Sequence, residues 1–303
     1  MQGRPLTADD RFAFSLEASG STTAEAIENG EVVMPAETTA AVKGNGSSDT
    51  AGFYFDEIIF KAEGVYSFQI AEIPPPGVSG QNPVSDGIWY DTHTTEVTVT
   101  VTRNPDTGIL HAAAFYNNTG AISNSALTDK AVFTNLWAGL TVDKTVSGNM
   151  GDRDKMFDFR LTLTDERGAA LSGSYRYFIG TTAGILTLDE SGTATFQLKH
   201  GQNITIFGLP EGGRYEISEP GAKDDGYTVK VTASADTTTT DRIEGALLTD
   251  AAVHVTFENQ KNQVPATGIF QDNWPWLTMI GLVLTAGTTL LFSSKRFRRK
   301  RGV

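Results

Sequence analysis

Residues 157–163 read Phe-Asp-Phe-Arg-Leu-Thr-Leu, and this run decides the fold class because an apolar residue occupies every second position. A period of two places the apolar side chains on one face of an extended strand. Similar runs recur between turn signals rich in Gly, Pro, Asn and Asp, and no helical period persists before the C-terminal apolar segment. We therefore predict an all-β protein built from immunoglobulin-like β-sandwiches. The other runs are Phe12–Leu16, Tyr66–Ile70, Glu96–Thr102, Thr193–Leu198, Tyr227–Thr232 and Val253–Phe257.

A loose internal repeat divides the chain into two domains. In each half an apolar strand comes first, a strand ending in glutamate follows, and a strand ending in asparagine comes last. We predict an N-terminal β-sandwich over residues 1–138, a C-terminal β-sandwich over 139–262 and a processing segment over 263–303. The matching segments are Asp10–Phe14, Gly64–Glu72 and Val132–Asn135 in the first half, and Lys155–Phe159, Gly213–Glu219 and Thr256–Asn259 in the second.

The charge of the chain argues against nucleic acid as a partner. The formal net charge is -12, and residues 1–294, without the six cations of the C-terminal tail, carry 18 Lys and Arg against 36 Asp and Glu. Nucleic-acid binding requires clustered Lys and Arg. The chain also has no cysteine. A domain exposed outside the cell must then rely on core burial or on a covalent link other than a disulfide.

Three features follow one another at the C-terminus. Residues 264–268 read Val-Pro-Ala-Thr-Gly, an uncharged apolar segment occupies 274–292, and six Lys and Arg lie within 295–301. The apolar segment has nineteen residues, close to the roughly 20 that cross a bilayer as a helix, and its basic flank follows the positive-inside rule. This order resembles the cell-wall sorting signal of Gram-positive surface proteins, with Val264 in place of the leucine of Leu-Pro-any-Thr-Gly.

The resemblance to a sorting signal implies that a sortase cuts the chain within this motif, between Thr267 and Gly268, and transfers the Thr267 carbonyl to an amine. The protein should then be exported to the cell surface and held only transiently in the membrane by its C-terminal helix. An ordinary single-span anchor is the alternative. Residues 1–10 contain no apolar core of a signal peptide, so we expect the chain to be N-terminally truncated. The motif residues are Val264, Pro265, Ala266, Thr267 and Gly268.

One lysine, one glutamate and one asparagine fall in the apolar phase of three strands of the second domain. Lys144 alternates with the apolar residues of 140–146, Glu219 with those of 215–217, and Asn259 with those of 253–257. Burying such groups without partners is costly, so we expect the three side chains to meet in the core. Glu216 is the rival acid, but it falls out of phase and should face solvent.

The chemistry of these three side chains suits an autocatalytic cross-link. A lysine amine in an apolar core loses its proton readily and becomes a nucleophile, while a buried carboxyl stays protonated. Glu219 can polarise the Asn259 carboxamide and shuttle the proton while Lys144 attacks and ammonia leaves. The product is an intramolecular isopeptide bond, formed once as maturation rather than by enzyme turnover, with no cofactor and no metal. The alternative is a buried ion pair and hydrogen-bond network without a covalent bond.

The segments Leu140–Gly148, Tyr215–Glu219 and Phe257–Asn259 carry a family resemblance. In this order they resemble the C-terminal domain of FctA (T-antigen type) backbone pilins, and residues 196–202 and 208–212 look like parts of Cna-B-like modules. The first half resembles the N-terminal pilin isopeptide-linkage domain, so the resemblance covers residues 1–268. It implies that the isopeptide residues are Lys144, Glu219 and Asn259.

The first domain repeats the acid and the amide but not the lysine. Glu72 follows the buried phase of Tyr66, Phe68 and Ile70, and Asn135 follows that of Ala131 and Phe133. Residues 1–42 contain no lysine. We therefore expect the lysine partner of Asn135 to lie just upstream of Met1.

Lys130 is the expected acceptor for polymerisation. In the resembling pilins, a lysine just before the last strand of the N-terminal domain receives the threonine of the next subunit. Lys130 shares a face with Val132 and Thr134, so it should point outward. Lys61 is the rival lysine, and an ordinary surface lysine is the alternative reading of Lys130.

We expect a structural subunit of a covalent pilus that a sortase joins to other copies of itself, with peptidoglycan and minor pilins as further partners. The alternative is a wall-anchored adhesin or minor pilin that does not polymerise. A surface hydrolase is disfavoured, because the chain has no Gly-any-Ser-any-Gly motif and no cysteine nucleophile. Its histidines show no metal-ligand spacing; they are His93, His111, His200 and His254.

Overall fold

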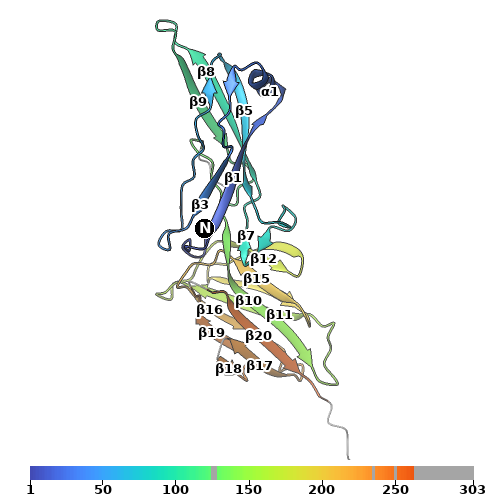
Figure 1. Cartoon of the computed structure of the whole chain (residues 1–303). Helices are drawn as coiled ribbons and strands as arrows, with labels where there is room; N and C mark the ends of the chain where they lie inside the picture. Colours follow the sequence, from blue (N-terminus) through green and yellow to red (C-terminus); the bar gives the residue numbers. More distant parts are fainter. Residues whose placement is uncertain (124–127, 234–235, 249–250, 263–303) are drawn as a thin grey trace, which may run out of the picture. The chain divides into compact units, whose positions relative to one another are not determined.

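The computed structural model describes residues 1–123, 128–233, 236–248 and 251–262 (Figure 1). Regular structure in these ranges is almost entirely β-strand, which confirms the all-β expectation. No helix there is long and apolar enough to cross a membrane, and the span expected at residues 274–292 lies outside them.

A five-stranded antiparallel sheet frames the N-terminal part, in the order β3-β1-β5-β8-β9. In β8 buried and exposed residues alternate, and Val97, Val99 and Val101 are buried. With Phe68 and Ile70 of β5 they belong to one hydrophobic cluster. The bounds are β1 Arg11–Ser19, β3 Thr39–Lys43, β5 Gly64–Ile73, β8 Thr94–Arg103 and β9 Leu110–Asn117, and a separate short pair consists of β2 Val32–Val33 and β4 Ile59–Phe60.

Helix α1 (Ser21–Glu28) is an element that the sequence patterns did not predict. It has eight residues, of which only Thr23 and Ala26 are buried, so its apolar period is too short to recognise. The Thr23 hydroxyl accepts a hydrogen bond from the Ser67 backbone N–H at 2.8 Å, which ties the helix to β5.

The prediction of a strand at Val132–Asn135 is wrong, because the backbone of this segment is irregular. The Val132 N–H donates to Asn118 Oδ1 at 3.0 Å, and the Thr134 N–H donates to Asp91 Oδ2 at 2.9 Å. Side chains thus satisfy backbone groups that a neighbouring strand would otherwise satisfy.

Strand β10 (Leu136–Ser147) runs through the domain boundary expected at residues 138–139. Leu136 and Trp137 pair with β7 (Ile88–Trp89), which in turn pairs with β6 (Val84–Ser85). From Ala138 onward β10 pairs with β15 (Asn203–Phe207). One continuous strand therefore carries pairings to segments on both sides of the expected boundary.

Two sheets enclose the C-terminal core. One has the order β13-β12-β15-β10-β20-β17-β18 and the other β14-β11-β16-β19. Phe159 of β11 and Phe257 of β20 are both fully buried, and their rings meet edge to face at 5.1 Å. The bounds are β11 Phe157–Thr164, β12 Ser174–Ile179, β13 Thr182–Thr187, β14 Thr193–Leu198, β16 Arg214–Ser218, β17 Thr228–Ala233, β18 Asp236–Thr238, β19 Arg242–Ala246 and β20 Val253–Gln260.

The first and last strands of this sandwich, β10 and β20, are parallel neighbours. Lys144 stands opposite Phe257, and Val146 stands opposite Asn259. Parallel strands need a long connection, and here nearly the whole domain lies between the two. The pairing places a lysine and an asparagine two residues out of register on adjacent strands.

Candidate functional site

The central feature of the C-terminal domain is a buried trio of Lys144, Glu219 and Asn259. Lys144 lies on β10, Asn259 lies on β20, and Glu219 directly follows β16. Each of the three is at most 1% exposed. Lys144 Nζ lies 2.7 Å from Glu219 Oε1, and Asn259 Nδ2 donates to the same oxygen at 2.8 Å. One carboxylate oxygen therefore holds the amine and the carboxamide together.

The trio leaves several buried polar atoms without hydrogen bonds. Lys144 Nζ is close to the Glu219 carboxylate but poorly aligned for a hydrogen bond, and neither Glu219 Oε2 nor Asn259 Oδ1 has a hydrogen-bond partner within the described residues. Such atoms are rare in folded proteins because desolvation makes them costly. They include the amine and the carbonyl oxygen that an attack of Lys144 on Asn259 would engage.

Burial sets the protonation tendencies of this site. It lowers the pKa of Lys144 to about 8, although the nearby Glu219 acts in the opposite direction. Burial also raises the pKa of Glu219, against the effect of Lys144. The Lys144 amine lies 4.4 Å from the Phe157 ring centroid and 5.9 Å from that of Phe159, so its surroundings are apolar. Both shifts favour a neutral amine beside a neutral carboxyl, which is the state that nucleophilic attack needs.

Glu216, the rival acid, lies outside the trio, and so do Lys61, the rival acceptor lysine, and His254. Glu216 is half-buried, and its carboxylate is 3.5 Å from Arg242. Lys61 and His254 are exposed. None of these three contributes to the buried trio.

The N-terminal domain holds a second acid and amide pair. Asn135 Nδ2 donates to Glu72 Oε1 at 2.8 Å, and both residues are buried. Burial raises the pKa of Glu72 to about 8. Glu72 Oε2 has no hydrogen-bond partner, and no lysine pairs with this carboxylate, in the part of the chain that the structure describes.

Asp91 is a functional candidate that sequence reasoning missed. Its backbone N–H donates to Asn135 Oδ1 at 2.7 Å, so the Asn135 carboxamide is held at both ends. A donor at this oxygen would stabilise the negative charge that develops there when a nucleophile attacks the amide. A backbone contact between residues 44 positions apart leaves no signal in the sequence.

The chain entering the N-terminal domain repeats the parallel geometry of β10 and β20. Gln2 forms a parallel bridge with Leu136. The Gln2 N–H donates to the Asn135 carbonyl at 2.8 Å, and the Trp137 N–H donates to the Gln2 carbonyl at 2.9 Å. Register therefore places Met1 opposite Asn135.

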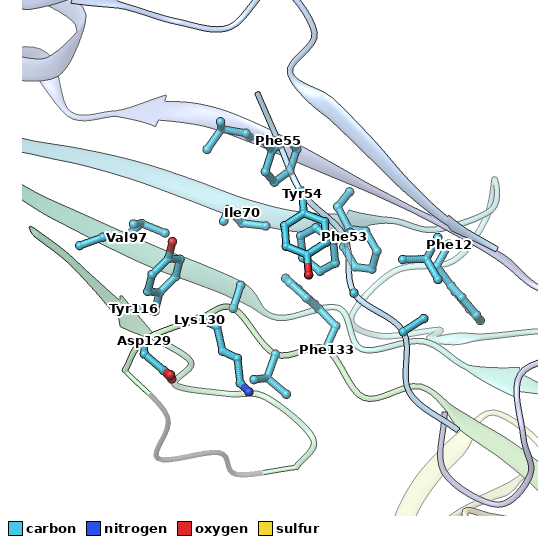
Figure 2. Close-up of a pocket in the computed structure, with 18 of the residues that line it drawn as sticks. Phe12, Phe53, Tyr54, Phe55, Ile70, Val97, Tyr116, Asp129, Lys130 and Phe133 are labelled. Atoms are coloured by element: carbon cyan, nitrogen blue, oxygen red, sulfur yellow. The ribbon is translucent and has the colours of Figure 1, made fainter. Parts of the chain in front are cut away.

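Lys130 is exposed, as its phase predicted, although it does not precede a strand. Figure 2 shows it beside Asp129 and near Phe133 among the side chains that line a cavity of about 1100 Å³. Asn118 Nδ2 donates to the Lys130 carbonyl at 3.0 Å, which fixes the backbone while the amine stays accessible. The sorting motif at residues 264–268 lies outside the described residues.

Comparisons with known proteins find isopeptide-containing domains and pilus proteins. Residues 1–138 match the family described as "Spy0128-like isopeptide containing domain", and residues 138–261 match a family described as a domain of unknown function (DUF7601). The pilus tip adhesin Cpa of Streptococcus pyogenes is 34% identical over 193 residues, covering 60% of this chain and 26% of the adhesin. A pilin of Streptococcus pyogenes serotype M1 is 28% identical over 269 residues, covering 85% of this chain and 75% of the pilin.

The crystal structure of the major pilin from Streptococcus pyogenes aligns over 86% of this chain and 94% of that chain, with 24% identity and a TM-score of 0.38. The present chain spans about a quarter of the adhesin's length and three quarters of the pilin's.

The proteins that the chain resembles are thus streptococcal pilus proteins, and the family matched by its first part is one of isopeptide-containing domains. Residues 1–138 match the Spy0128-like isopeptide family, and the similarity to a pilin over most of the chain supports a backbone pilin of the T-antigen type.

Proposed function

We propose that this protein is a structural subunit of a covalent, sortase-assembled pilus on the surface of a Gram-positive cell. The observation that carries the proposal is the buried trio, in which Glu219 Oε1 contacts both the Lys144 amine and the Asn259 amide. A fibre under load needs domains that do not unfold, and a covalent bond between first and last strands supplies this property without cysteine. The matches to a pilin and to the isopeptide family support the same function.

The bond forms by exchange of one amide for another. Lys144 gives a proton to the Glu219 carboxylate, and its neutral amine attacks Asn259 Cγ. Glu219 then passes this proton to the departing amide nitrogen, and the proton that the Lys144 nitrogen sheds on becoming an amide follows through Glu219, so that ammonium leaves and a Lys144–Asn259 isopeptide replaces the carboxamide. No external reactant is consumed, and Glu219 is returned to its initial state.

The topology explains the mechanical value of this bond. The chain enters the sandwich on β10 and leaves it on β20, and these two strands are adjacent and parallel. A bond between them therefore connects the entry strand directly to the exit strand. Pulling on the two ends then loads the cross-link directly, and the strands between them stay enclosed.

The inter-subunit bond completes the proposed fibre. A sortase cuts after Thr267, and the Thr267 carbonyl is joined to the exposed Lys130 amine of the next subunit. The segment 274–292 holds the precursor in the membrane until cleavage, and minor pilins or peptidoglycan provide the ends of the polymer. Force then runs from Lys130 to Thr267 and crosses the cross-linked domain.

The N-terminal pair of Glu72 and Asn135 is proposed as a second isopeptide half-site. In the C-terminal domain the lysine lies two residues before the residue opposite the asparagine. Met1 is opposite Asn135, so the equivalent lysine position is the second residue before Met1. An extension that places lysine there should lower the intact mass by one ammonia. The same extension on Asn135→Ala should not, and an unchanged mass in both would refute this register.

The decisive test of the function is sortase-dependent polymerisation in a producing cell. We expect high-molecular-weight ladders that disappear with Lys130→Ala and persist with Lys61→Ala. Ladders that persist with Lys130→Ala would refute the acceptor assignment.

A second candidate, a wall-anchored adhesin or minor pilin, is favoured by the 34% identity to a tip adhesin. A wild-type chain that reaches the wall as a monomer, with no ladder, would support this candidate instead.

A further inference from the structure

A second group of reactive side chains lies in the N-terminal domain, next to the Glu72–Asn135 pair, because the Asp91 backbone N–H donates to Asn135 Oδ1. Asp91 and His93 lie in the irregular segment just before β8, and Thr95 is the second residue of that strand. Asn118 follows the neighbouring strand β9. The side chains of Asp91 and His93 are 1% and 4% exposed, and Thr95 and Asn118 are also buried. A nucleophile, a base, an acid and a carboxamide thus share a water-excluded site.

The four side chains form a continuous chain of contacts. His93 Nδ1 lies 2.8 Å from Asp91 Oδ1, and His93 Nε2 lies 3.1 Å from Thr95 Oγ1. The Thr95 hydroxyl donates to Asn118 Oδ1 at 2.9 Å. The order acid, imidazole, hydroxyl is that of a nucleophilic triad, and here the group next to the hydroxyl is an amide within the same chain.

The acid and the imidazole are held in fixed orientations. Asp91 Oδ2 accepts the backbone N–H groups of Ile122 and Thr134 at 3.2 and 2.9 Å, which leaves Oδ1 directed to the imidazole. The His93 ring packs at 4.6 Å from the ring of Phe133. With its Nδ1 proton directed to Asp91, His93 can accept the Thr95 proton at Nε2 once the hydroxyl rotates from Asn118 Oδ1 toward the imidazole.

The carboxamide is fixed in a similar way. Asn118 Oδ1 accepts the Val132 backbone N–H at 3.0 Å, and Nδ2 donates to the Lys130 carbonyl at 3.0 Å. The first contact is suited to stabilise an oxyanion on Oδ1. The second identifies Nδ2 as the nitrogen, which is the leaving group of the proposed reaction.

We propose that Thr95 and Asn118 form an intramolecular ester. The Thr95 hydroxyl gives its proton to His93 Nε2, and Oγ1 attacks Asn118 Cγ. The tetrahedral intermediate collapses when His93 returns the proton to the amide nitrogen, which leaves as ammonia. One C–N bond breaks and one C–O bond forms, and no oxidant or cofactor takes part. His93 is the catalytic base, and Asp91 is a positioning residue.

Cross-strand register supports this pairing. Glu96 stands opposite Asn117 in the ladder of β8 and β9, so Thr95 and Asn118 are the next pair beyond it. An ester there closes the end of the hairpin from which the chain leads to Lys130. Burial of Thr95 excludes the water that would otherwise hydrolyse the ester.

The test is the intact mass of the purified chain and of Thr95→Val, which keeps the shape of the side chain but removes the nucleophile. Relative to the mass calculated from its own sequence, wild type should lack one ammonia more than Thr95→Val does. Thr94→Val is the matched control, because Thr94 is exposed on the opposite face of the strand, and it should match wild type. Alkaline hydroxylamine should cleave the ester of wild type and leave an isopeptide bond intact.

Peptide mapping of the wild type decides the question even if Thr95→Val does not fold. Recovery of the Thr95 peptide covalently joined to the Asn118 peptide supports the ester. Recovery of both peptides unlinked overturns it, as does an equal ammonia loss in wild type and in a folded Thr95→Val. The readout is independent of the Lys144–Asn259 bond, because Glu219→Ala removes only the ammonia loss of that bond.

Discussion

Replacing Glu219 with alanine removes the one oxygen that contacts both the Lys144 amine and the Asn259 amide. Among the described residues, Glu219 is the acid that contacts both side chains, so without it the lysine proton has no carboxylate to accept it and pass it to the leaving nitrogen. We expect Glu219→Ala to fold without the isopeptide bond and to retain one ammonia that the wild type loses.

The structure sets the size of the effect on stability. The link from Lys144 to Asn259 closes a loop of more than a hundred residues, and a cross-link of that length contributes about 5 kcal/mol in the chain-entropy model. The Lys144 amine, left buried without its acid partner, adds to the loss. For a domain of a little over a hundred residues, about 5 kcal/mol corresponds to a fall in melting temperature on the order of 20 °C.

Two measurements check this prediction. Intact mass spectrometry of wild type and Glu219→Ala, each compared with its own sequence mass, should differ by one ammonia. Calorimetry should show the fall in melting temperature, together with faster proteolysis. Glu216→Ala is the matched control, because Glu216 lies on β16, the strand that Glu219 directly follows, but is half-exposed and paired with Arg242. It should keep the wild-type mass and melt within a few degrees of wild type.

An equal ammonia loss in wild type and Glu219→Ala would show that this glutamate is not needed for the bond. An unmodified Lys144 in the wild type, found by peptide mapping, would refute the bond itself. The trio would then be a buried ion pair and hydrogen-bond network only.

Three further outcomes follow from the same geometry. Lys130→Ala should abolish sortase-dependent ladders while the melting temperature stays within a few degrees of wild type, because the amine is exposed; a large loss of stability would mean that Lys130 is structural. Burial raises the pKa of Glu72 to about 8 from 4.5, so its proton stabilises the fold fully below about pH 4.5, and this stability is lost as pH rises through about 8. Glu72→Gln should therefore flatten the fall in melting temperature over this window, and an unchanged slope would contradict the assignment. In a chain extended with a lysine two residues before Met1, Asp91→Asn should lower the yield of the bond to Asn135 without preventing folding. The reason is that the Asp91 side chain accepts the Thr134 N–H and so anchors the backbone N–H that donates to Asn135. Full bond yield would argue against this role.

Much of this protein could be predicted from the order of its residues. Strict alternation in segments such as 157–163 produces strands wherever one face is buried, and it also fixes which side chains enter the core. Lys144, Glu219 and Asn259 therefore had to be buried once their strands formed, and three buried polar groups need partners. The prediction failed for residues 131–135, where alternation is present but side chains of Asp91 and Asn118 hold the backbone in place of a strand.

Only the tertiary structure decided which groups meet and in what register. That β10 and β20 are parallel neighbours, two residues out of step at Lys144 and Asn259, depends on packing between segments far apart in the chain. The hydrogen bond from the Asp91 backbone N–H to Asn135 Oδ1 likewise depends on tertiary packing. Period and composition act along the chain and determine what is buried. Distances between reactive atoms depend on how sheets pair and stack, because contacts of long sequence separation leave no local pattern.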